Sequence, residues 1–98
     1  MPPITIIPMK SANFVEMSEQ LYQQLLLDTK EISISIGKKM VTIKIRSGEM
    51  NPDEIHFPEN LFQLFQLPIQ RYKFHAIYQE NTHSLLLCPV IGLVTDFK

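Results

Sequence analysis

Residues 54–67, EIHFPENLFQLFQL, contain a short apolar segment, a helix-forming segment and a stop, and they repeat a pattern found forty residues earlier. Residues 15–36 align with residues 55–76 without a gap. The positions that are identical or apolar in both copies are Glu19/Glu59, Leu21/Leu61, Gln23/Gln63, Leu27/Leu67, Val15/Ile55, Met17/Phe57, Tyr22/Phe62, Leu25/Phe65, Ile32/Tyr72 and Ile34/Phe74. One such unit cannot bury its apolar side alone, so we expect the two copies to pack around one shared core.

The segments on either side of the repeat predict the order of strands and helices. Residues 31–36 and 40–45 alternate apolar with polar side chains around Gly37, which is typical of a half-buried hairpin. Ser18 is a good N-cap for the first helix, and Pro58 suits the first turn of the second. The expected strands lie at about 4–9, 14–17, 31–36, 40–45, 55–57, 71–78 and 84–95, and the expected helices run from Glu19, after the Ser18 cap, to 27–28 and over about 59–66.

Two copies of strand, short helix and hairpin predict a mostly β single domain, residues 1–98, with two short helices on a closed pseudo-twofold barrel. The copies span about 14–46 and 54–90, each a βαββ unit. The unit resembles the swapped-hairpin unit of AbrB-type transition-state regulators, and it is similar to the half-units of double-psi barrels, within the cradle-loop barrel group. The choice between these two topologies stays open. The alternative is an open α+β sheet with both helices on one face.

Composition and charge limit the classes of protein to be considered. The net charge is −1 with interspersed signs, whereas a dedicated nucleic-acid or anionic-membrane surface needs a concentrated positive field. Cys88 is the sole cysteine, which excludes an internal disulfide and favours a reduced compartment. No basic leader precedes an apolar run at the N-terminus, and the apolar run at 85–94 is too short to span a bilayer. We therefore expect a soluble, cytoplasmic protein that is not secreted by a signal peptide.

Both ends of the chain carry a second resemblance. The opening residues 4–9, ITIIPM, the two helix-plus-hairpin copies and the closing residues 89–94, PVIGLV, resemble the N-terminal region of endospore-coat-associated YheC/YheD-type ATP-grasp proteins. In that family a glycine stands where this chain has Cys88, and the ATP-binding and magnesium-binding residues have no counterpart among these 98 positions. The resemblance implies a noncatalytic accessory domain, cytoplasmic or spore-associated, whose partner is an ATP-grasp domain or a coat component. A longer parent chain could be an ATP-grasp enzyme, and an oligomer is possible.

Residues capable of catalysis or metal binding are scattered along the chain. His56, His75, His83 and Cys88 lack any short spacing that would place two metal ligands together. We expect His75 to face solvent beside Lys73, and Cys88 to be a small buried apolar residue. The sequence therefore predicts no catalytic residue, cofactor or metal.

Two surfaces remain as candidates for binding. AbrB-type units bind DNA through arginines near the strand–helix junction, but residues 13–14, 22–24 and 62–64 carry no cation at the matching places. A small DNA-binding regulator is thus the alternative function, with nucleic acid an unlikely partner, and a small-molecule-binding barrel ranks third. The helices also hold more apolar surface than one short face needs, at Leu26, Phe62, Leu64 and Phe65. These four side chains belong either to the core and its rim, which we favour, or to a docking patch for a partner.

Overall fold

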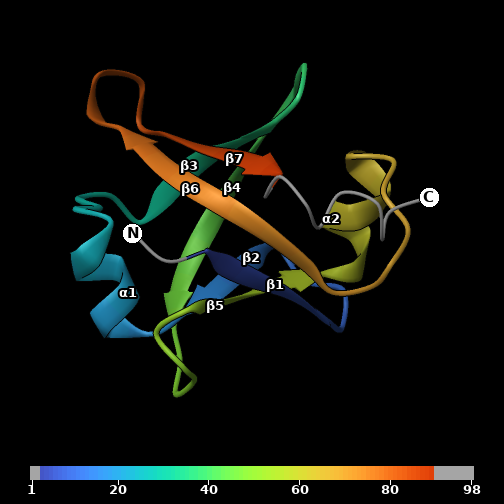
Figure 1. Cartoon of the computed structure of the whole chain (residues 1–98), viewed down its shortest axis with the longest axis horizontal. Coiled ribbons are helices and arrows are strands. Elements are labelled where there is room, and N and C mark those ends of the chain that lie inside the picture. The colour runs from blue at the N-terminus through green and yellow to red at the C-terminus, as the bar shows by residue number, and fades with distance from the viewer. Residues whose placement is uncertain (1–2, 90–98) are drawn as a thin grey trace.

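The computed structural model describes residues 3–89, in which seven strands close into a barrel that carries two short helices (Figure 1). The strands are β1 (Ile4–Met9), β2 (Phe14–Met17), β3 (Glu31–Ile36), β4 (Lys39–Ser47), β5 (Glu54–Pro58), β6 (Tyr72–Gln79) and β7 (Ser84–Pro89). The helices are α1 (Glu19–Gln24), α2 (Glu59–Leu64) and the single 3-10 turn η1 (Glu80–Thr82). Around the barrel the order is β1-β5-β2-β4-β3-β7-β6, and β6 pairs with β1 to close it. The closed barrel is confirmed, and the open sheet is wrong.

The two halves of the barrel are interleaved. β2 runs parallel to β4, with Val15 opposite Ile45. In the same way, β5 runs parallel to β1, with Ile55 opposite Ile6. β4 and β1 are also antiparallel to β3 and β6 respectively, while β7 lies between β3 and β6. The pairing therefore relates β1-β2-α1-β3 to β4-β5-α2-β6. The sequence repeat instead relates β2-α1-β3-β4 to β5-α2-β6-β7, so it begins one strand later.

The core is a single cluster to which both copies contribute equivalent anchors. Leu21 and Leu61 are completely buried, and Ile34 and Phe74 line the interior as the repeat predicts. The second copy adds a chain of rings, Phe57, Phe62, Tyr72 and Phe74, whose successive centroids are 5.8, 6.0 and 5.8 Å apart. The aligned positions in the first copy are Met17, Tyr22, Ile32 and Ile34. One half of the core is thus aromatic where the other is mainly aliphatic.

Both helices end in the same left-handed turn. Leu26 and Gln66, forty residues apart, each have φ 58°, a conformation that glycine usually supplies. The following amides close the turn, because Leu27 N donates to Tyr22 O at 3.1 Å and Leu67 N donates to Phe62 O at 2.9 Å. The helices consequently end at Gln24 and Leu64, earlier than predicted. Their starts differ: Ser18 Oγ accepts the Leu21 amide at 3.0 Å, whereas Pro58 provides no side-chain cap.

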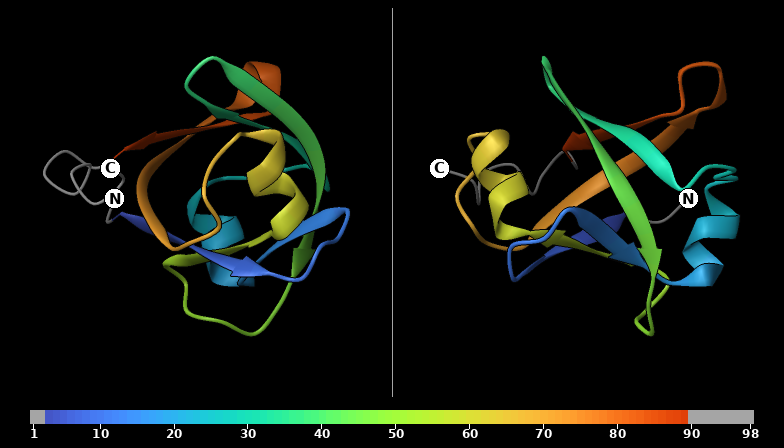
Figure 2. Two further views of the ribbon diagram at one scale, coloured as in Figure 1. Left: turned by 90° about the vertical axis from the view of Figure 1, so that its right-hand side faces the viewer. Right: turned by 180° about the vertical axis from the view of Figure 1, so that it is seen from behind.

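The helices lie at opposite ends of the barrel, as the views from three sides show (Figures 1 and 2). Between residues 3 and 89 no helix has the length and apolar character needed to cross a membrane. The predicted strand at 84–95 is confirmed as far as Pro89, and its remainder lies outside the described residues, as do residues 90–94 of the closing motif.

Candidate functional site

The four residues predicted as a docking patch do not share a surface. Phe62 and Phe65 are buried, 0% and 6% exposed, which agrees with the favoured assignment to the core and excludes them from the alternative, a docking patch. Leu26 and Leu64 are 80% and 56% exposed, but they follow α1 and end α2 respectively, at opposite ends of the barrel. The helices cover opposite ends of the barrel, and the two phenylalanines belong to the core and not to a patch.

Of the three histidines and the cysteine, His75 and Cys88 lie opposite each other on β6 and β7, whereas His56 on β5 and His83 before β7 lie apart from them. Among residues 3–89 no three His, Cys, Asp or Glu side chains gather where they could hold a metal ion. His75 is exposed, as predicted, while Cys88 is only partly buried, so its placement in the core was wrong. His56 Nε2 lies 3.9 Å from Glu54 Oε1, which is a loose contact between partly exposed groups. These residues offer no catalytic constellation.

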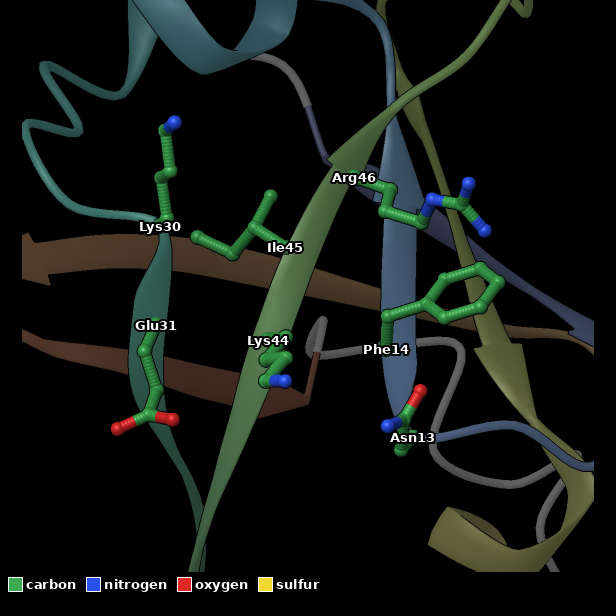
Figure 3. Close-up of a pocket in the computed structure, with 7 residues that line it drawn as sticks. All are labelled: Asn13, Phe14, Lys30, Glu31, Lys44, Ile45 and Arg46. Atoms are coloured by element: carbon green, nitrogen blue, oxygen red, sulfur yellow. The ribbon is translucent and has the colours of Figure 1, made fainter.

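An open groove of about 640 Å³ lies on the outer face of the barrel along β4 (Figure 3). Its walls carry three cationic side chains, one carboxylate and two apolar side chains. The lining residues are Asn13, Phe14, Lys30, Glu31, Lys44, Ile45 and Arg46. We call this hollow, with the extensions described below, the β4 groove.

Strand pairing brings the groove residues together from distant parts of the sequence. Lys44 lies opposite both Phe14 on β2 and Glu31 on β3, so the three side chains form a row across the outer face. The guanidinium carbon of Arg46 lies 4.6 Å from the centre of the Phe14 ring, within the range of a cation–π contact. Lys30 is fixed beside them, because its carbonyl accepts the Ile45 amide at 2.8 Å.

α2 positions the start of β2 and therefore the Phe14 side of the groove. The Asn60 side chain accepts the Ala12 amide through Oδ1 at 3.1 Å, and its Nδ2 donates to the Ala12 carbonyl at 3.0 Å. This double hydrogen bond holds the loop between β1 and β2 against α2. Asn13 and Phe14 follow directly, so their position depends on a residue almost fifty positions later in the chain.

The groove continues in both directions along β4. A hollow of about 400 Å³ shares Lys30 and Ile45 with it and reaches Tyr22. A second hollow, about 260 Å³, shares Lys44 and reaches the exposed Leu64 at the end of α2. One end of the β4 groove is therefore apolar, while its middle is cationic. Leu64 is the single predicted docking residue that lines it.

Positive charge is concentrated in and near this groove. Five of the nine Lys and Arg residues lie within residues 30–46, whereas Glu31 is the only one of ten acidic residues there. The remaining positions hold four basic and nine acidic residues, so the net charge of −1 combines +4 in one segment with −5 elsewhere. Sequence reasoning from net charge and from residues next to the helices missed this segregation, although a count along the chain would have shown it.

A separate polar cluster ties the loop after α1 to the turn before β7. Tyr78 Oη donates to Asp28 Oδ1 at 2.7 Å and lies 3.1 Å from His83 Nδ1. Burial, together with the hydrogen bond to the Asp28 carboxylate, raises the pKa of Tyr78 to about 12. The phenol thus stays protonated across the physiological range, which suits a structural link better than acid–base chemistry.

The chain matches no protein-family model and no curated protein sequence. Among solved structures it is similar to the computationally designed protein msDPBB_sym2, with a TM-score of 0.53 and 12% sequence identity over 74% of this chain and 95% of that one. At this identity the likeness speaks for the fold alone. Together with the interleaved strand pairing, it shows that the chain folds as a double-psi β-barrel with pseudo-twofold symmetry.

Proposed function

We propose that the chain is a noncatalytic interaction domain that binds a protein partner. The observation that supports this function is the β4 groove, an open surface whose charged groups are the three cations Lys30, Lys44 and Arg46 and the two carboxylates Glu31 and Glu19. Such a lining can hold a ligand by charge and apolar contact; Ser47 Oγ donates to Glu19 Oε2 at 3.1 Å, but neither a histidine nor a cysteine lines the three hollows, so no Ser–His or Cys–His pair is present there. These groups are suited to binding a ligand and not to catalysing a reaction on it.

The sequence resemblance suggests which kind of protein the partner is. The opening residues of β1 and the two repeat copies resemble the N-terminal region of YheC/YheD-type proteins, so we propose an accessory role beside an ATP-grasp domain or a coat component, in the cytoplasm or on the spore. The partner could belong to the same polypeptide or to a second one.

Calorimetric titration of the purified chain with an ATP-grasp domain of the spore-coat-associated type tests the proposal. We expect saturable binding and no ATP turnover by the chain alone. ATP hydrolysis or ligation that copurifies with the 98 residues and disappears on heat denaturation would overturn the noncatalytic assignment.

A small DNA-binding regulator is the second candidate, and the cluster of Lys30, Lys44 and Arg46 favours it. Three phosphate contacts would give log K a slope of about −2.7 against log salt concentration, because each contact contributes about −0.9. Fluorescence anisotropy with labelled duplex DNA between 50 and 200 mM salt, about the range in which such contacts weaken, distinguishes the two functions. Absence of binding at the lowest salt would eliminate this candidate.

A further inference from the structure

The β4 groove carries unpaired positive charge. Within residues 3–89, neither Lys30 nor Lys44 makes an ion pair with its side chain, and the side-chain contact of Arg46 is the one with Phe14. The carboxylate of Glu31 points away from the ammonium of Lys30 in Figure 3, although the residues are adjacent. The cations are thus available to acidic groups from outside, and charge-assisted hydrogen bonds to carboxylates are stronger than neutral ones.

The groove also has a direction. β4 is paired on both edges, with β2 and β3, so no main-chain ladder is open to a partner, and recognition must use side chains. The three connected hollows follow β4 from Ser47 to Val41. At about 3.3 Å per extended residue, a stretch of about seven residues fits along that length.

The lining distinguishes between two polyanions. A nucleic acid carries a charge at every phosphate and would meet the carboxylates of Glu31 and Glu19 in the groove wall, whereas an acidic peptide can place uncharged side chains beside them. Glu16 also lies beside the groove, opposite Arg46 in the β2–β4 register, and so disfavours a ligand whose charge is unbroken along its length. Leu64 additionally provides an apolar contact for an aliphatic side chain, which nucleic acids lack.

We propose that the β4 groove binds an extended acidic segment of a partner protein, with carboxylates on Lys30, Lys44 and Arg46 and an apolar side chain beside Leu64. The inference rests on the proposed interaction function and specifies the chemistry of its partner. It also assigns a role to the Arg46–Phe14 pair, in which the ring holds the guanidinium on the outer face, with the guanidinium carbon 4.6 Å from the ring centre. A carboxylate can then approach the outward-facing edge of the guanidinium.

The test uses a fluorescein-labelled ten-residue peptide in which glutamates alternate with leucines, titrated with the full chain at 150 mM salt. Anisotropy should report saturable binding, and replacing the glutamates with glutamines should abolish it. Lys44→Glu with Arg46→Glu should weaken binding at least about a hundredfold, about tenfold for each lost charge-assisted contact.

Lys38→Glu with Lys39→Glu is the matched control, because it changes the net charge equally at the exposed tip of the hairpin, outside the groove. This control should weaken binding less than about threefold, because Lys38 and Lys39 line none of the three hollows. Circular dichroism and thermal unfolding establish that both variants fold. Equal losses in the two double variants, unchanged affinity for the glutamine peptide, or tighter binding of a ten-residue oligothymidine would each overturn the inference.

The outcome is separable from that of the proposed function. If an ATP-grasp domain binds while the acidic peptide does not, the interaction function stands and the assigned chemistry is wrong. If the chain proves to hydrolyse ATP, the noncatalytic function falls whatever the peptide does. Chemical-shift changes in amide NMR spectra should fall on residues 13–14, 30–31 and 41–47, because these positions line the groove.

Discussion

Truncation of Leu21 or Leu61 to alanine should destabilise the barrel strongly, since both side chains are 0% exposed and occupy equivalent places in the two copies. Each truncation removes three carbon groups, worth about 0.8 kcal/mol apiece on transfer from water, or roughly 2.4 kcal/mol. The cavity left behind adds about 24 cal/mol per Å³, so the whole cost is about 2 to 5 kcal/mol. We place Leu61→Ala nearer the upper value, because large rings dominate its half of the core, whereas flexible Met17 can fill space near Leu21.

Urea unfolding followed by far-ultraviolet circular dichroism measures these losses against a total stability of about 5 to 15 kcal/mol for a domain of this size. Leu64→Ala in the same helix as Leu61 is the matched control, because its side chain is 56% exposed. It should cost no more than about 0.5 kcal/mol. A cost below about 1 kcal/mol for both buried leucines, or a control as damaging as Leu61→Ala, would refute the assignment of equivalent core anchors.

Three other predictions concern the turns and the polar links. Leu26→Gly and Gln66→Gly should each stabilise the fold by about 0.5 to 1 kcal/mol, because glycine adopts the left-handed conformation without strain; a lower urea midpoint in either variant would contradict this. The raised pKa of Tyr78 means that its contribution to stability is complete below pH 10 and is lost as the pH rises from 10.0 to about 12. Tyr78→Phe should therefore flatten the fall in unfolding free energy over that window, whereas an unchanged slope would argue against the link to Asp28. Asn60→Ala should cost about 1 to 2 kcal/mol through two lost hydrogen bonds and accelerate hydrogen exchange at the Ala12 amide, and unaltered exchange there would show that the Asn60 contacts do not hold the loop.

The barrel was predictable from the sequence because its signals are local and repeated. The alternation at 31–36 depends on residues that are close in the chain. The match of the two copies is visible because they align without a gap. The helix ends were predicted too late because neither Leu26 nor Gln66 is a glycine, so no residue type marked the left-handed turn. Tertiary packing of the following leucines, and not local preference, fixes those ends.

The candidate site was not predictable by the same reasoning. Lys44 meets Phe14 only because β2 and β4 pair in parallel, a contact between residues thirty positions apart that no periodicity encodes. Apart from Leu64, the four apolar helix residues did not indicate the position of the site either. A six-residue helix seated against a barrel interior buries several faces, so the excess of apolar side chains, Phe62 and Phe65 among them, reflected burial and not a partner.

The exchange of strands between the halves also determines when the chain can fold during its synthesis. Thr5 on β1 pairs with Glu54, and Ile4 pairs with Phe74, seventy residues later. At about 5 to 20 residues per second on the ribosome, β1 waits about 4 to 14 seconds for its last partner. Until β5 has emerged, the isoleucines of β1 have no strand to pair with, so chaperones have access to them. The first half cannot close before β6 has emerged, and the barrel must form as one late, cooperative event.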